Sequence, residues 1–175
     1  ERHETRGAAV LALTRFVERT GDAGVAALDD FFDGMLHAAV ALEALSRRAP
    51  LDQVRSGDAL VARLEQAMVL GDGASRAADR SQGVRTLRGG LPRAVSAFAK
   101  RFEHEVLSWL EGWLDRAERP ETRDVLTETL SELRRAAVSE ARVDRLRARL
   151  AASAPPDRDA ARVVAGTRKR SRGRR

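Results

Sequence analysis

The sequence predicts an all-α fold: a bundle of five or six helices followed by a basic, flexible C-terminal tail. Apolar residues recur at steps of three and four, as they do along one face of a helix. Sustained alternation of apolar and polar residues is absent, and β-branched and aromatic residues are sparse. Ala, Leu, Arg and Glu, all good helix formers, dominate instead. The 175 residues suffice for one domain with its own core, so we place the bundle at 1–152 and the tail at 153–175.

Two helices are expected in the first part of the bundle. The first covers about residues 5–20, because a glycine-rich turn follows at 21–24. The second and longer one covers about residues 25–48, and Pro50 is expected to stop it. Its apolar stripe consists of Leu28, Phe32, Met35, Ala39 and Leu42.

The middle of the chain is less regular. Ser56 is a typical residue at a helix start, and Gly71-Asp72-Gly73 is expected to end the helix that follows. Residues 74–90 hold several arginines and glycines but few large apolar residues, so we expect a short helix or an ordered loop there.

The last third of the bundle is predicted as two long helices. Pro92 suits the first turn of a helix that continues to about residue 119. Trp109 and Trp113 share its apolar stripe, and we interpret them as core residues. Pro120 then starts or kinks a helix that runs to about residue 152, although its apolar pattern shifts register before Val143.

The positive charge lies at the C-terminus. The chain has a formal net charge of +6, yet residues 1–152 hold 24 basic and 24 acidic side chains. Residues 153–175 hold eight basic and two acidic side chains, and therefore carry the whole net charge. A basic end on a neutral body is typical of a protein that meets an anionic partner.

Several chemical classes lack the residues that they need. The chain has no cysteine, which excludes disulfides, thiolate metal sites and a cysteine nucleophile. No phosphate-binding glycine loop and no Gly-x-Ser-x-Gly motif is present. His37 and His104 lie beside acidic residues on polar helix faces, which favours solvated histidines over metal ligands. We therefore expect no cofactor and no metal, and we predict that the protein is not an enzyme; an acid pair inside the bundle is the remaining catalytic possibility.

The leading hypothesis is a non-enzymatic helical protein that contacts the phosphate backbone of nucleic acid without reading base sequence. Its contacts would come from the end of the last helix and from the tail. The predicted contact residues are Arg135, Arg142, Arg145, Arg149, Arg168, Lys169, Arg170, Arg172, Arg174 and Arg175. The four helix arginines also suit a solvated face that complements the helix dipole, and the tail also suits solubility or coding bias. Around Ser171 the tail resembles a nuclear import signal or a basophilic kinase site.

The main alternative is a scaffold or regulatory subunit that binds a partner helix in an apolar groove of the bundle. Helices as long as those predicted also favour a homo-oligomer. No apolar run approaches the length of a membrane-spanning helix, so a membrane is not expected as a partner. The expected location is intracellular: cytoplasmic, or nuclear if the source is eukaryotic or viral.

Overall fold

The computed structural model describes residues 3–153, and every element in that range is a helix. The all-α prediction is therefore confirmed for the described residues. The predicted number of helices is too low, because nine α-helices and two short 3₁₀ helices lie between residues 3 and 153. Apart from Ser153, the predicted tail, including its six contact residues at 168–175, lies outside the described residues.

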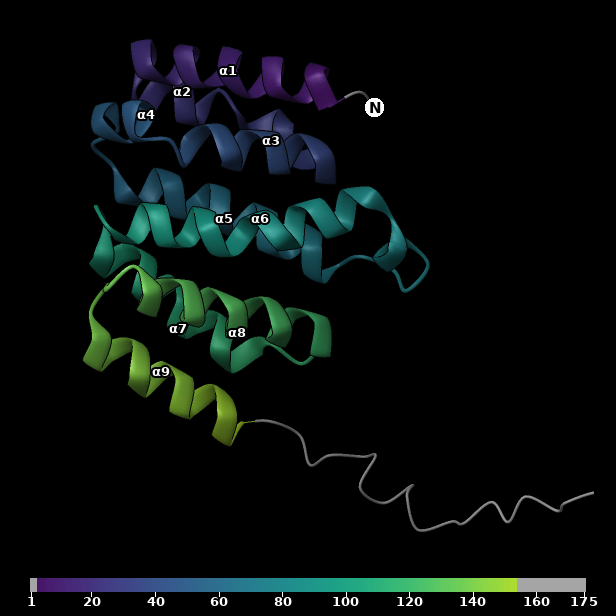
Figure 1. Cartoon of the computed structure of the whole chain (residues 1–175), viewed down its shortest axis with the longest axis vertical. Coiled ribbons are helices and arrows are strands. Elements are labelled where there is room, and N and C mark those ends of the chain that lie inside the picture. Colours follow the sequence, from purple (N-terminus) through teal and green to yellow (C-terminus); the bar gives the residue numbers. More distant parts are fainter. Residues whose placement is uncertain (1–2, 154–175) are drawn as a thin grey trace, which may run out of the picture.

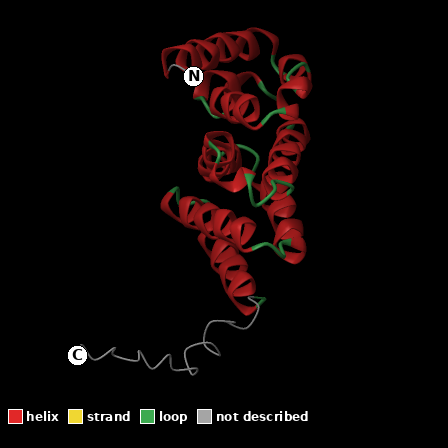
Figure 2. Cartoon of the chain, turned by 90° about the vertical axis from the view of Figure 1, so that its right-hand side faces the viewer, coloured by secondary structure: helices red, strands yellow, loops and turns green. Residues whose placement is uncertain are grey.

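The helices stack in two layers along one long axis (Figures 1 and 2). Each helix of the first layer packs against the next one in order. This layer consists of α1 (His3–Thr20), α3 (Met35–Leu45), α6 (Gln82–Ala99), α8 (Pro120–Arg135) and α9 (Glu140–Ala152). The second layer consists of α2 (Asp22–Ala26), α4 (Arg48–Gln53), α5 (Gly57–Asp72) and α7 (Glu103–Arg116). The 3₁₀ helices η1 (Asp29–Asp33) and η2 (Ala78–Arg80) lie in connecting segments.

One apolar core runs between the two layers for nearly the length of the stack. Phe98 of α6 is its largest fully buried side chain. Trp113 of α7 is only 4% exposed, and Trp109 is half-buried against the same core, which confirms their predicted core role. Because α6 touches α3, α5, α7 and α8, it forms the central support of the stack.

The predicted helix over 25–48 is wrong, because the structure divides it into α2, η1 and α3. Gly34 has extended backbone angles (φ −135°, ψ 135°), which separate η1 from α3. Pro50 does not stop a helix either. It is the third residue of α4. The N–H groups of a helix's first turn have no acceptor within the helix, so a proline there costs no helical hydrogen bond.

The segment 74–90 contains η2 and the first half of α6. Ser81 caps α6 by accepting a hydrogen bond from the backbone N–H of Val84 at 3.3 Å. Pro92 therefore lies inside α6 rather than at its start. The predicted helix over 92–119 is also divided, since α6 ends at Ala99 and α7 begins at Glu103.

The last predicted helix is divided at residues 136–139, where the apolar pattern shifts register. The N–H of Val138 donates to the carbonyl of Leu133 at 3.1 Å, and the N–H of Ala137 donates to that of Arg134 at 3.0 Å. This pair of bonds is a Schellman motif, which ends a helix with one residue in the left-handed region. Ala137 takes that position with φ 55°, although glycine is the usual residue there.

We expect Ala137→Gly to raise the free energy of unfolding by about 1 kcal/mol, because glycine adopts positive φ without the steric cost that a Cβ brings. Thermal or urea unfolding of the variant measures the change. An Ala136→Gly variant is the matched control and should lower stability, since Ala136 has φ −81° at the end of α8. A loss of stability in Ala137→Gly would contradict the assigned turn.

Candidate anion-binding surfaces

Two of the predicted contact arginines on α9 bind carboxylates of α7. The Nε of Arg142 lies 2.9 Å from Oε1 of Glu111, and Nη2 of Arg149 lies 2.5 Å from Oδ1 of Asp115. Arg142 also donates to the hydroxyl of Ser108 at 3.3 Å. These contacts join α9 to the second layer, so both arginines have a structural role in the described part of the chain.

The other two helix arginines differ from each other. Arg135 of α8 forms ion pairs within its own helix, with Glu128 at 2.7 Å and Glu132 at 2.8 Å. Arg145 is exposed and forms no ion pair with a described residue. Arg147, which the sequence analysis did not select, has the same exposed and unpaired character. The predicted stripe is therefore not one continuous cationic surface.

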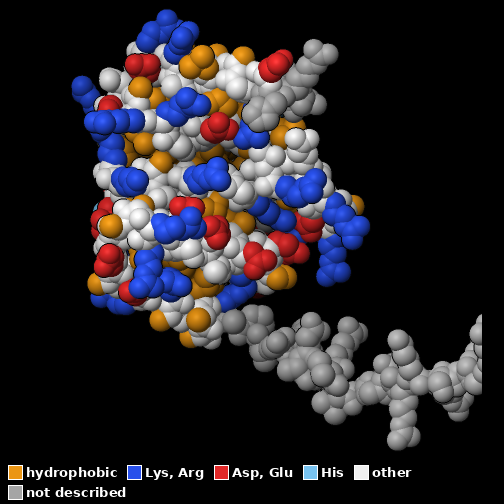
Figure 3. Space-filling view, in the orientation of Figure 1, with side chains coloured by type: hydrophobic (Ala, Val, Ile, Leu, Met, Phe, Trp, Pro, Cys, Tyr) orange, Lys and Arg blue, Asp and Glu red, His pale blue; other side chains and the backbone are white. Residues whose placement is uncertain are grey.

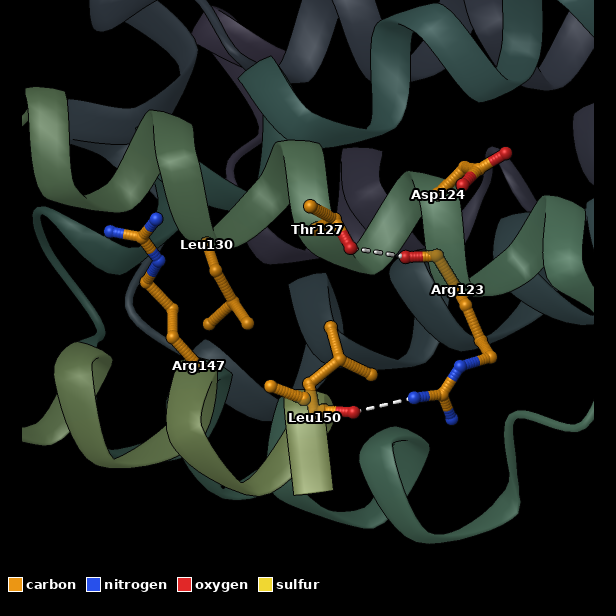
Figure 4. A pocket seen from close by; sticks show the side chains of 7 residues that line it. Arg123, Asp124, Thr127, Leu130, Arg147 and Leu150 are labelled. Carbon is orange, nitrogen blue, oxygen red and sulfur yellow. Dashed lines mark hydrogen bonds between the residues drawn. The ribbon is translucent and has the colours of Figure 1, made fainter. Parts of the chain in front are cut away.

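A hollow of about 350 Å³ lies between α8 and α9, next to the point where the described chain ends (Figure 4). Arg123 lines one end, where its Nη2 donates to the carbonyl of Leu150 at 2.5 Å and to the hydroxyl of Ser153 at 3.3 Å. These bonds satisfy backbone and side-chain acceptors at the end of α9. Arg147 lines the other end, with Leu130 and Leu150 between the two arginines.

A second surface, which we call the α3–α6 groove, consists of two adjoining hollows that share Ser46. The first measures about 410 Å³ and the second about 650 Å³. The first is lined by Arg6, Ala39, Glu43, Ser46, Arg85, Thr86, Gly89, Gly90 and Arg93. The second is lined by Ser46, Arg48, Leu51, Asp52, Ala97, Lys100 and Arg101.

Positive charge exceeds negative charge in the α3–α6 groove, where six cationic side chains face two carboxylates. Glu43 is paired with Arg6 at 2.8 Å, and Asp52 lies 3.5 Å from both Arg48 and Arg101. The three remaining cations are exposed and form no ion pair with a described residue; they are Arg85, Arg93 and Lys100. On the face that Figure 3 draws, Lys and Arg side chains form a band across the middle, at the level of α6.

Sequence reasoning missed the α3–α6 groove because it did not assign residues 82–90 to α6. Once α6 is known to begin at Gln82, Arg85, Arg93 and Lys100 follow one another at intervals of eight and seven residues. At about 3.6 residues per turn these intervals are about 2.2 and about 1.9 turns, so the three side chains lie within a sector of about 80° around the helix. The Ser81 cap was the available signal, and the surrounding arginines and glycines obscured it.

Among residues 3–153, two carboxyl groups have pKa values below their ordinary ones. Burial raises the pKa of Glu65. Hydrogen bonds from the two indoles and the charge of Arg116 lower it by more than burial raises it, so the net pKa is below the ordinary value of 4.5. A hydrogen bond from Gln66, together with the hydrogen bond and charge of Arg63, lowers the pKa of Asp29. Both groups are thus held as carboxylates, which suits structural ion pairs rather than a general acid.

No group of three or more potential metal ligands occurs within residues 3–153. His37 of α3 contacts the Phe31 ring edge-on, with 6.2 Å between ring centroids. In the part of the chain that the structure describes, no helix combines the length and the apolar character needed to cross a bilayer. Comparison of the chain with protein-family models, with curated proteins and with solved structures finds no match.

Proposed function

We propose that this protein is a non-enzymatic helical interaction protein whose C-terminal end contacts the phosphate backbone of nucleic acid. The observation that carries the proposal is the charge asymmetry: the net charge of +6 belongs wholly to residues 153–175, and six cations lie within the last eight residues. Such a concentration of cations has no use in a folded core but suits phosphate neutralisation.

Within the proposal, the arginines near the end of the bundle divide into two groups. Arg145 and Arg147 are exposed on α9 without described ion pairs, so they can extend the cationic surface of the tail. Arg142 and Arg149 instead attach α9 to α7. Their role is to fix the helix from which the tail continues, and Arg135 is paired on α8.

The proposed contacts carry no sequence preference. Arginine guanidinium groups can bind two phosphate oxygens at once, which strengthens a contact without reading a base. The chain has no tyrosine, and the indole N–H groups of both tryptophans donate to Glu65, so neither tryptophan is assigned to base stacking in this proposal.

Binding to a duplex DNA and a duplex RNA of arbitrary sequence tests the proposal. The tail variant replaces all six cations of residues 168–175 with Gln, and a second version of the chain ends at Ala154. We expect both to lose at least tenfold in affinity at low salt, and we expect DNA and RNA duplexes to behave alike. Unchanged affinity in both would overturn the proposal.

The double variant Arg142→Gln/Arg149→Gln is the control for arginines that are paired within the folded part of the chain. It removes two cations from α9 but leaves the tail, Arg145 and Arg147 intact. Because these two arginines are paired with Glu111 and Asp115, we expect a loss of stability and less than a threefold loss of affinity. A larger loss of affinity than in the tail variant would place the main phosphate contact on α9.

A further inference from the structure

We propose that the α3–α6 groove binds an acidic amphipathic helix of a partner protein. This site is separate from the C-terminal end and does not depend on the nucleic-acid proposal. It would make the protein a connector, with one surface for a partner helix and another for phosphates.

Charge complementarity is the first support. Glu43 and Asp52 are already engaged by cations of the groove itself. Arg85, Arg93 and Lys100 therefore remain as exposed positive charges along one side. A ligand with carboxylates beside these three side chains can form ion pairs with them, and no described residue does so.

The spacing of the three cations supports a helical ligand. Along α6 and its C-cap residue Lys100, the three are separated by about 12 Å and about 10.5 Å, because each residue of an α-helix rises by about 1.5 Å. A helix with acidic residues at every seventh position repeats its carboxylates at about 10.5 Å. Such a helix, aligned along α6, can bring one carboxylate to each of the three cations.

The floor of the groove supports a close approach. Gly89 and Gly90 are consecutive in the interior of α6, where glycine is the least favourable residue after proline. A Cβ atom added at either position would meet no heavy atom within 4 Å, so packing within the described chain does not require glycine there. With Ala39 and Ala97 they give the groove a shallow lining of small residues, against which an apolar helix face can pack.

The same observations favour an acidic helix over nucleic acid. Small apolar residues and Leu51 line the groove between the cations, and they match an aliphatic helix face better than a sugar–phosphate chain. Glu43 and Asp52 would also repel a continuous row of phosphates. No aromatic side chain lines either hollow, so bases would have no stacking partner.

The test uses the full-length protein and a fluorescein-labelled 21-residue helical peptide with Glu at three positions seven residues apart and Leu and Ala on the same face. A peptide of the same composition in scrambled order is the ligand control. By fluorescence anisotropy, the ordered peptide should bind at least tenfold more tightly than the scrambled one. Equal binding of the two peptides would overturn the proposal.

Protein variants locate the site. Arg85→Gln/Arg93→Gln should weaken the ordered peptide at least tenfold, whereas the matched control Arg15→Gln/Arg19→Gln on α1 should leave its affinity within twofold. Gly90→Leu should fill the groove and abolish binding without lowering the melting temperature, because a Cβ atom at this position meets no neighbouring heavy atom within 4 Å and leucine is a better helix former than glycine. Full peptide affinity in Gly90→Leu, or equal losses in the two arginine pairs, would refute the site.

Two cross-experiments separate this proposal from the nucleic-acid proposal. The variant with residues 168–175 neutralised should bind the ordered peptide as the wild type does. Arg85→Gln/Arg93→Gln should keep its affinity for duplex DNA. If that double variant loses DNA binding and keeps peptide binding, the groove is a phosphate site and the acidic-helix proposal is wrong.

Discussion

Glu65→Ala should lower the free energy of unfolding by about 2–3 kcal/mol, because it removes an acceptor that three side chains share. Oε2 of Glu65 accepts hydrogen bonds from the indole Nε1 atoms of Trp109 and Trp113, each at 2.7 Å. Arg116 adds contacts at 3.0 Å to both carboxylate oxygens. Alanine would leave the indole N–H of nearly buried Trp113 without its acceptor, so α5 and α7 would lose their main polar connection.

The Glu65 connection also predicts a pH dependence. Its pKa is lowered in the folded protein, so its stabilisation is present above the ordinary value of 4.5 and is lost as pH falls through the folded-state pKa. The chain has only two tryptophans, and both donate to this carboxylate. Tryptophan fluorescence should therefore report its protonation directly during an acid titration.

Denaturant unfolding of Glu65→Ala and Glu65→Gln measures the effect. Glutamine keeps an acceptor oxygen but loses the charge that faces Arg116, so its loss should be smaller than that of alanine. The acid-induced fluorescence change should disappear in both variants. A wild-type-like stability for Glu65→Ala, with the acid transition intact, would contradict the assigned contacts.

Asp79→Ala should also lower the free energy of unfolding by about 2–3 kcal/mol, because it leaves two half-buried guanidinium groups without their shared carboxylate. Asp79 of η2 lies 2.9 Å from Nη1 of Arg88 and 3.6 Å from Nη2 of Arg119, with side-chain exposures of 19%, 14% and 28% for the three residues. Arg88 also donates to the carbonyl of Gly71 at 2.7 Å, and Arg119 donates to the carbonyls of Asp72 and Ala74. These bonds hold the segment after α5 against α6 and α8.

Chemical denaturation of Asp79→Ala, Asp79→Asn and Asp30→Ala measures this contribution. Asparagine keeps one acceptor and should cost less than alanine. Asp30 is exposed and forms no ion pair with a described residue, so Asp30→Ala is the matched control and should change stability by less than 0.5 kcal/mol, roughly the effect of an ordinary surface substitution. Equal stabilities for Asp79→Ala and Asp30→Ala would show that the assigned network contributes nothing.

The apolar pattern predicts the helical class and much of the core, but not where the helices break. Leu28, Phe32 and Leu42 lie on a predicted stripe and are buried. The break at Ala137 has no glycine to mark it, since alanine holds the left-handed position. The break at 100–102 has neither glycine nor proline, and after it α7 packs against α5 and α6.

The candidate sites were harder to predict than the fold, because charge pairing is a tertiary property. The sequence places Arg142, Arg145 and Arg149 on one helix but does not show that Glu111 and Asp115 of α7 face two of them. Most residues of the α3–α6 groove come from four helices, α1, α3, α4 and α6, which only the tertiary fold brings together. The six tail cations are evident in the sequence, and their role stays a prediction.

The salt dependence of duplex DNA binding by the full chain and by the variant with residues 168–175 neutralised tests the central claim most directly. Phosphate contacts release counterions, so six contacts give a slope of about −5 in a plot of log affinity against log salt concentration. We expect the full chain to show a slope at least this steep, and the variant to lose about five units of it. Equal slopes in the two proteins would contradict the claim that the C-terminal cations neutralise phosphates.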